Sequence, residues 1–237
     1  MPGEQRSPVH VAFRTWDAAS EPLESVEARI HDGVPLDQLR ARAAGYLEIF
    51  HRPYPHARVA RQPEVMEIGS GVGYVMEAAL HRYRPSRIVG LDVAAGMIQK
   101  ARERLRRDGV DHPGIGFAHY DGVHAPFPDD SFDLIYSVAS LQHAPRPYCF
   151  RALMEAYRMV RPGGTVFIHL LACSHFRRHM TPELFRAEID RQIAMREGHW
   201  HHYYSADELD AVARQGLGIR SPGIRELGGS LYLYFSK

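Results

Sequence analysis

The sequence has few cysteines and no long apolar run, and each shortage excludes a class of protein. Its two cysteines, Cys149 and Cys173, have no CxxC neighbour and no metal-ligand spacing, so we expect two buried free thiols. No stretch approaches the ~18 apolar residues of a membrane-spanning helix, and the N-terminus lacks the apolar core of a secretory signal. We therefore expect a cytoplasmic protein with no membrane partner.

An excess of charge of either sign is also missing. The chain has 29 Lys and Arg against 28 Asp and Glu, and its formal net charge is +1. Such a balance gives no field that would hold a polyanion, so nucleic acid is not the expected partner. At 237 residues and 45% hydrophobic, the chain is long enough to bury a substantial core.

Short apolar runs alternate with helical patterns from residue 64 to residue 171, which is typical of a parallel sheet covered by helices. We expect helices after the first, second and fourth strands, because apolar residues recur there at three- and four-residue spacing. The strands are expected at residues 64–68, 88–92, 115–121, 132–138 and 165–171, and a final strand at residues 230–235.

The flanking regions have a different organisation. Residues 1–60 are expected to form a helical lid or cap, with helices near residues 22–31 and 35–51. The second helix has an apolar stripe, which fits either packing on the sheet edge or covering an active site. Residues 61–237 are expected to form the core domain, interrupted by a histidine- and aromatic-rich insertion at about 173–204. After it, Ser205 to Glu208 reads as a capping box.

The most informative motif is the run Glu67-Ile68-Gly69-Ser70-Gly71-Val72-Gly73, in which an apolar strand leads directly into three alternating glycines. A strand needs glycine where its backbone turns tightly or approaches a ligand closely. A dinucleotide-binding G-x-G-x-x-G motif would place its third glycine at position 74, where this chain has Tyr74. The spacing therefore departs from the dinucleotide motif, and taken alone it fits several families that bind nucleotide-type cofactors.

Three further features follow in order along the chain. Asp92 ends the second strand, where a carboxylate can accept hydrogen bonds from ribose hydroxyls. Asp121 and Gly122 close the third strand, where an acid can accept from an adenine amino group. The fourth strand, a helix and the turn Arg161-Pro162-Gly163-Gly164-Thr165 complete the pattern.

These motifs resemble those of the class I S-adenosylmethionine-dependent methyltransferases, and in particular their broad small-molecule group. The resemblance covers residues 64–171. It implies a Rossmann-like α/β fold, a doubly wound sheet of seven strands in the order 3-2-1-4-5-7-6. The last strand is antiparallel, and helices cover both faces. It also implies S-adenosylmethionine as cofactor, S-adenosylhomocysteine as product, and no metal.

The resemblance assigns parts of the cofactor to particular residues. The methionine part falls to Glu67 and the glycine loop, the ribose to Asp92, the adenine to Asp121 and Gly122, and the sulfonium side to the end of the fourth strand. The expected cofactor-binding residues are Glu67, Gly69, Ser70, Gly71, Gly73, Asp92, Val93, Met97, Asp121, Gly122, Ser137 and Val138.

Methyl transfer from a sulfonium requires mainly alignment and exclusion of water, so a catalytic base is optional. His143, after the fourth strand, and His169, inside the fifth, are the candidate bases, although either histidine can instead have a structural role. No D/N-P-P-F/Y motif follows the fourth strand, which favours an O- or N-methylated small molecule over a nucleic-acid base. We expect a monomer or a homodimer.

The acceptor is expected to contact the lid helix and the insertion. The candidate residues are Tyr46, His175, His199, Trp200, His202 and Tyr203. The histidines of the insertion, with His179, also have the residue type of a Zn²⁺ or Fe²⁺ site, but an imidazole-lined acceptor pocket is the simpler interpretation. Two other functions stay open, namely an NAD(P)-dependent oxidoreductase and a catalytically silent cofactor-binding or partner-activating subunit.

Overall fold

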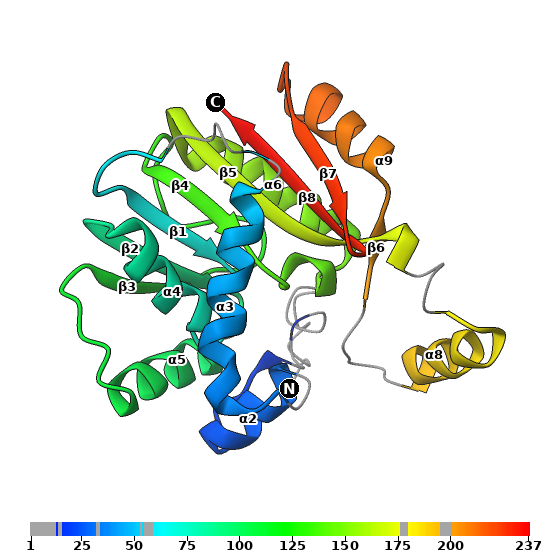
Figure 1. Ribbon diagram of the computed structural model, residues 1–237, viewed down its shortest axis with the longest axis horizontal. Helices are drawn as coiled ribbons and strands as arrows, with labels where there is room; N and C mark the ends of the chain where they lie inside the picture. The colour runs from blue at the N-terminus through cyan, green and yellow to red at the C-terminus, as the bar shows by residue number, and fades with distance from the viewer. Residues whose placement is uncertain are drawn as a thin grey trace, which may run out of the picture.

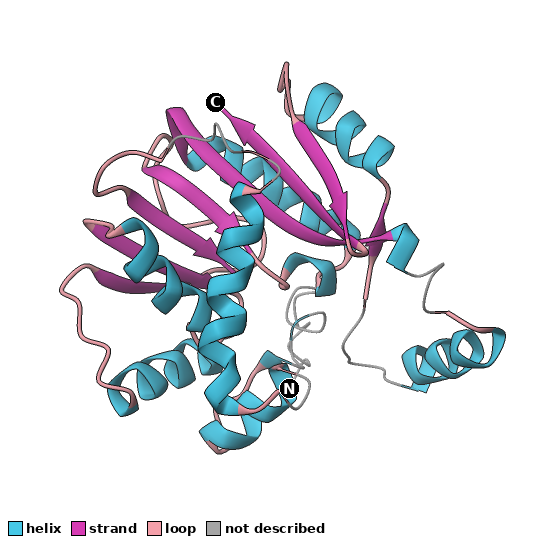
Figure 2. Cartoon of the chain, in the orientation of Figure 1, coloured by secondary structure: helices cyan, strands magenta, loops and turns pink. Residues whose placement is uncertain are grey.

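The structure is a computed structural model, and it describes residues 13, 16–31, 34–52, 54, 59–175, 180–194 and 201–237. Helices and strands alternate through its central part, as Figures 1 and 2 show. The helical elements are α2 (Leu23–Ile30), α3 (Leu36–His51), α4 (Tyr74–Tyr83), α5 (Ala95–Arg107), η2 (Leu141–His143), α6 (Arg146–Met159), α8 (Pro182–Ala194), α9 (Ala206–Ala211) and η3 (Val212–Gly216). The strands are β1 (Glu64–Ile68), β2 (Arg87–Asp92), β3 (Ile115–His119), β4 (Phe132–Ser137), β5 (Val160–Ala172), β6 (Tyr203–Tyr204), β7 (Gly223–Leu227) and β8 (Ser230–Ser236).

The sheet has the order β3-β2-β1-β4-β5-β8-β7. Strands β1 to β5 pair in parallel, whereas β8 pairs antiparallel with both β5 and β7. The expected topology with an antiparallel last strand is therefore confirmed. The short β6 is an addition, because it pairs in parallel with the end of β5 and lies outside the main path.

The two faces of the sheet pack against different helices, because successive side chains of a strand point to opposite faces. Met66 and Ile68 of β1 belong to the cluster that includes Leu153 of α6. Val65 of β1 belongs to the cluster that includes Phe50 of α3 and residues of α4. The strands between these clusters are buried on both faces, as their continuous apolar runs predict.

The N-terminal helices pack on the α4 and α5 side of the sheet. In Figure 1, α3 crosses in front of the strands and α2 lies beside α5. The α3 stripe has two parts: Leu47 and Phe50 pack against the sheet, while Leu39 and Ala43 pack with residues of the glycine loop and α5. The same helix therefore contributes to the core and reaches the carboxyl ends of the strands.

Some local expectations need correction. Cys149 is buried, but Cys173 is exposed, because it follows β5 at the point where the chain leaves the sheet. Helix α6 ends at Met159 and β5 begins at once, so the Pro-Gly-Gly turn lies within the start of the strand and not before it. At α9 the N-cap half of the expected capping box is confirmed, since the Ser205 hydroxyl accepts the Glu208 N–H at 3.1 Å, while the Glu208 carboxylate pairs with Arg146.

No helix in the described part of the chain is both long and apolar enough to cross a bilayer.

Candidate active site

The glycine loop joins β1 to α4, and its backbone requires glycine. Gly69, Gly71 and Gly73 all have positive φ angles, of 72°, 52° and 86°. A Cβ on Gly69 would also overlap the hydroxyl of Ser140, which lies in the loop after β4. The loops that follow β1 and β4 therefore touch each other at this position.

Asp92 holds the glycine loop against the end of β2. Its carboxylate accepts the Gly71 N–H at 3.0 Å through one oxygen and the Ala94 N–H at 3.0 Å through the other. The side chain is 6% exposed, and burial raises the pKa of Asp92 to about 6, although the backbone hydrogen bonds act in the opposite direction. The carboxylate thus lies at the carboxyl end of β2, held beside the glycine loop by two backbone donors.

Arg104 of α5 also holds the glycine loop in place. Its guanidinium donates to the carbonyls of Val72 at 3.1 Å and Gly73 at 2.8 Å, and it pairs with the carboxylate of Glu77 on α4. Arg104 is fully buried. Arg40 of α3 donates to the other Glu77 oxygen at 2.8 Å, so the network extends to the N-terminal helices.

A second ion pair connects α2 to the same region. Arg107 forms two hydrogen bonds with the Glu27 carboxylate, at 2.8 and 2.9 Å, and Glu27 also accepts the Tyr74 hydroxyl at 2.7 Å. Glu27 is fully buried, so this pairing offsets the cost of burying its charge.

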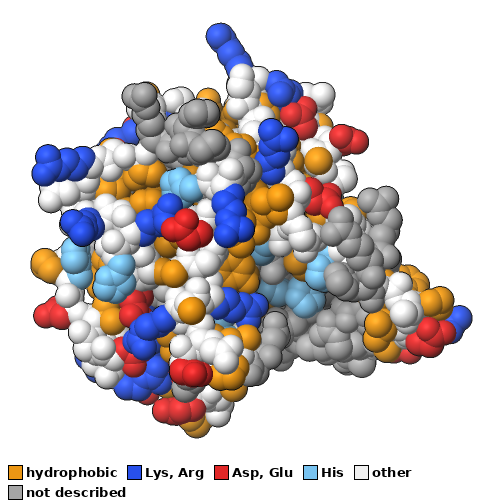
Figure 3. All heavy atoms as spheres, in the orientation of Figure 1, with side chains coloured by type: hydrophobic (Ala, Val, Ile, Leu, Met, Phe, Trp, Pro, Cys, Tyr) orange, Lys and Arg blue, Asp and Glu red, His pale blue; other side chains and the backbone are white. Residues whose placement is uncertain are grey.

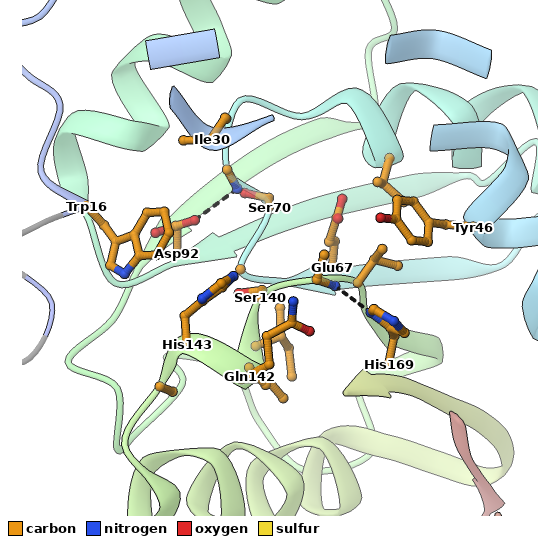
Figure 4. A pocket seen from close by; sticks show the side chains of 18 of the residues that line it. Trp16, Ile30, Tyr46, Glu67, Ser70, Asp92, Ser140, Gln142, His143 and His169 are labelled. Carbon is orange, nitrogen blue, oxygen red and sulfur yellow. Dashed lines mark hydrogen bonds between the residues drawn. The ribbon is translucent and has the colours of Figure 1, made fainter. Parts of the chain in front are cut away.

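A cavity of about 880 Å³ opens between the glycine loop, the loop after β4 and α3 (Figure 4). In Figure 4, Asp92 and Trp16 lie at one end, Tyr46 and His169 at the other, and Glu67, Ser140 and Gln142 between them. The expected cofactor residues that line the cavity are Glu67, Gly69, Ser70, Gly71, Gly73, Asp92, Val93, Met97, Gly122 and Val138.

Asp121 and Ser137 lie outside the lining residues. Asp121 accepts the N–H groups of Val123 and His124 at 2.8 and 2.7 Å, and these backbone bonds, the His124 one foremost, lower its pKa. Ser137 is fully buried and donates to the Ile68 carbonyl at 2.9 Å. Both side chains thus organise backbone next to the cavity, where Gly122 and Val138 form the wall.

Glu67 is a buried carboxyl group on the cavity wall. It is 1% exposed, and it accepts the Tyr136 hydroxyl at 3.2 Å. Burial raises the pKa of Glu67 well above its usual range, although the Tyr136 bond opposes the shift. A cationic ligand group beside Glu67 would stabilise its ionised form.

The two candidate bases differ in their surroundings. Both ring nitrogens of His169 have partners: Nδ1 accepts the Ala139 N–H at 3.0 Å, which leaves Nε2 to donate to Ser230 Oγ at 3.0 Å. Burial lowers the pKa of His169 to about 4. Ala139 has a positive φ of 50°, so His169 holds a strained residue of the loop after β4 in place.

His143 lies in η2 and faces the cavity between two other rings. Its ring centroid is 5.2 Å from that of Trp16 and 4.8 Å from that of His201. The neighbouring Gln142 is 6% exposed. Its backbone carbonyl oxygen accepts the His202 backbone N–H at 2.8 Å, which connects η2 to the segment that contains His201.

The expected acceptor residues separate into three groups. Tyr46, His175 and Tyr203 line the cavity, and the rings of His175 and Tyr203 are stacked. His202 is absent from the lining residues, since its backbone bonds to Gln142 instead. His199 and Trp200 lie outside the described residues, as does His179.

Several lining residues had no recognisable signal in the sequence. They come from the N-terminal segment and from α2, α3 and the start of α6: Phe13, Trp16, Arg29, Ile30, His31, Arg42 and Tyr148. Figure 3 shows histidine side chains inside the hollow beside α3. Arg42 lies four residues before Tyr46 on α3 and therefore on the same helix face, but the prediction for this face named Tyr46 alone.

Within the described ranges, no group of three or more His, Cys, Asp or Glu side chains is arranged to hold a metal ion.

Comparison with known proteins gives a consistent result. Residues 65–164 match the family model described as a methyltransferase domain. The chain is 28% identical over 165 residues to a phosphatidylethanolamine N-methyltransferase of Cereibacter sphaeroides, covering 69% of this chain and 75% of the relative. It is 29% identical over 163 residues to a fatty-acid O-methyltransferase of Mycolicibacterium smegmatis, covering 69% of this chain and 55% of the relative.

The fold is shared with solved structures. A putative S-adenosylmethionine-dependent methyltransferase from Methanococcus maripaludis superposes with a TM-score of 0.62 at 20% identity, covering 94% of each chain. The chain spans less than two thirds of the length of most curated relatives that it matches, with shares from 28% to 75%.

Proposed function

Since the chain carries a methyltransferase domain of the class I S-adenosylmethionine-dependent type, we propose that it transfers a methyl group to an oxygen or nitrogen atom of a small-molecule acceptor. The observation that carries this proposal is the cavity itself, in which the Asp92 carboxylate and the glycine loop lie at one end and Tyr46 and His169 at the other. A cofactor bound along the first end would direct its sulfonium toward the second.

In this proposal the residues around the glycine loop bind the cofactor. Asp92 accepts the ribose hydroxyls, the Glu67 carboxylate receives the methionine ammonium, and Val93 and Met97 pack beside the adenosine. Gly122 contacts the adenine, and Asp121 acts on it by holding the turn that contains Gly122. Ser137 positions the end of β1 through the Ile68 carbonyl.

The cofactor supplies an activated methyl group, and the protein supplies alignment and exclusion of water. Among the residues that the structure describes, those lining the cavity include many aromatic and imidazole rings, which suits a small organic acceptor. The two relatives also fit this reading, because their names give a phospholipid amine and a fatty acid as substrates. His143, which faces the cavity, is the better candidate for a general base, whereas His169 already uses both ring nitrogens.

Ligand binding and product formation test the proposal together. S-adenosylhomocysteine at about 100 times its Kd should stabilise the protein by about 2.7 kcal/mol and raise Tm by several degrees. NAD at the same concentration should leave Tm unchanged. Stabilisation by NAD alone would instead identify an oxidoreductase.

Transfer is measured with S-adenosylmethionine that carries a labelled methyl group and a panel of acids, phenols, amines and lipids. The expected result is label in one chemical class, with an equal amount of S-adenosylhomocysteine formed. If S-adenosylhomocysteine binds but no acceptor is labelled, the transferase proposal fails in favour of a silent cofactor-binding subunit.

A further inference from the structure

The charged groups of the cavity wall are unevenly distributed. Among the described lining residues, the carboxylates are Glu67 and Asp92, and both border the glycine loop. The cations of the wall, Arg29 and Arg42, come from α2 and α3. Arg29 pairs with Glu21 at 2.8 Å, so its charge is already matched.

Arg42 is different, because no described carboxylate lies within ion-pair distance of it. Its guanidinium donates to the Tyr46 hydroxyl at 3.3 Å and to the His31 carbonyl at 3.4 Å, both long hydrogen bonds to neutral groups. Its central carbon lies 5.9 Å from the centre of the Tyr46 ring. The pair therefore presents a positive charge and a hydroxyl at the edge of the cavity.

Tyr46 connects this cation to the interior. Its ring centroid is 5.6 Å from that of His169, and Figure 4 shows both rings at the end of the cavity away from Asp92. His169 cannot serve as a proton acceptor there, since its Nδ1 already accepts the Ala139 N–H. An ammonium group at this end would meet a cation and neutral rings, with no described carboxylate to pair with it.

We propose that this end of the cavity binds the acceptor as an oxygen acid, a carboxylate or a phenolate, and that Arg42 with Tyr46 pairs with its negative charge. The inference rests on the proposed methyltransferase function and narrows its acceptor. A guanidinium is well suited to bind a carboxylate through two parallel hydrogen bonds.

With an anionic acceptor, methyl transfer needs no catalytic base, because there is no proton to remove. A lone pair of the anionic oxygen forms the new bond to the methyl carbon as the carbon–sulfur bond breaks, and that electron pair passes to the sulfur. The sulfonium becomes the neutral thioether of S-adenosylhomocysteine, the acceptor becomes a neutral methyl ester or ether, and no proton is released. The positive and negative charges cancel as the transition state forms, so no new charge needs to be stabilised.

The experiment compares matched acids and amines on protein saturated with S-adenosylhomocysteine. Benzoate and benzylamine form one pair, and laurate and dodecylamine another, with binding measured by calorimetry. The acids are expected to bind at least tenfold more tightly than their amine partners. Tighter binding of the amines, or no binding by either acid, overturns the inference.

Two variants identify the binding residue. Arg42→Gln should weaken acid binding about tenfold to a hundredfold, and the control Arg102→Gln, on the surface of α5 over Phe117, should leave it unchanged. The carboxylate of the cofactor is the other possible source of the anion. If Arg42→Gln weakens S-adenosylhomocysteine but not 5′-methylthioadenosine, which lacks that carboxylate, the pair serves the cofactor and the inference is wrong.

These binding measurements also distinguish a failure of this inference from a failure of the proposed methyltransferase function. Failure of S-adenosylhomocysteine to bind the unmodified protein would contradict the methyltransferase function itself. Normal binding of S-adenosylhomocysteine with preference for amines contradicts only the choice of acceptor.

Discussion

The two ends of the cavity are built in different ways. At the Asp92 end, polar side chains hold the backbone: Asp92 and Arg104 bond directly to residues of the glycine loop. At the Tyr46 end, the wall consists of rings from distant parts of the chain, and its one nearby cation, Arg42, has only neutral partners among the described residues. One end is therefore preorganised by side-chain bonds to its backbone, whereas the other depends on the packing of rings from distant segments.

The largest expected effect comes from breaking the buried network at the Asp92 end. Arg104→Gln leaves Glu77 buried without its full pairing, and removing one partner of a buried ion pair typically costs about 3–5 kcal/mol. The free energy of unfolding, measured by denaturant titration, should fall by that amount. The control Arg102→Gln, on the exposed face of the same helix, should change it by less than about 0.5 kcal/mol. A small effect of Arg104→Gln would mean that the loop does not depend on this network.

Asp92→Asn removes the carboxylate but keeps the size of the side chain. Because hydrogen bonds to charged groups contribute about 1.5–3 kcal/mol, the affinity for S-adenosylhomocysteine should fall on the order of a hundredfold. Calorimetric titration measures the change. Asp210→Asn is the matched control, since Asp210 is a surface residue paired with Arg214 on the same helical segment. Near-normal affinity of Asp92→Asn would refute the ribose role.

At the opposite end of the cavity, variants of His169 test whether this histidine has a structural or a catalytic role. His169→Phe leaves the Ala139 N–H without its acceptor, which should lower the free energy of unfolding by about 1–3 kcal/mol. His169→Asn, whose amide oxygen can take the place of Nδ1, should recover part of that loss. If instead both variants are stable and turnover loses its dependence on pH, His169 acts as the base.

The smallest effect concerns the pH dependence of cofactor binding. Burial raises the pKa of Asp92 to about 6 in the free protein, and ribose hydroxyls require its ionised form. A proton must therefore leave on binding below about pH 6, so affinity should rise as pH increases and then level off. From about pH 5 to about pH 7 the expected gain is roughly tenfold. The gain should become smaller in Asp92→Asn without vanishing, because Glu67, whose pKa burial also raises, must likewise be ionised to receive the methionine ammonium. A flat profile in the unmodified protein would contradict the assignment.

Local patterns in the sequence predicted most of the fold. The positions of the first four strands, the glycine loop and Asp92 follow from apolar periodicity and from glycine placement, which involve only neighbouring residues. The early start of β5 at Val160 was not predicted. Sheet order and the antiparallel last strand came from the family resemblance, and the structure confirms them. The short β6 escaped prediction because two residues carry no periodic signal.

Long-range contacts explain what sequence could not supply. Arg104 lies seven residues after Met97 and three after Ala101, so helical spacing places it on the buried face of α5, but only the packing of α4 supplies its partner Glu77. Trp16 and Arg42 reach the cavity only because the N-terminal helices fold back over the carboxyl ends of the strands. Asp121 is a case in which the sequence position misleads. Its place at the end of a strand resembles that of Asp92, but its side chain caps a turn.

The contact between Gly69 and Ser140 links the sizes that these two residues can have. The Ser140 hydroxyl occupies the space that a Cβ on Gly69 would need, and Gly69 itself has a positive φ. A substitution that enlarges either residue alone would push the loop after β1 away from the loop after β4. In a library of variants, therefore, changes at position 140 should survive only when they remain small, whereas Arg42 and Tyr46, which line the cavity from α3, should tolerate wider changes.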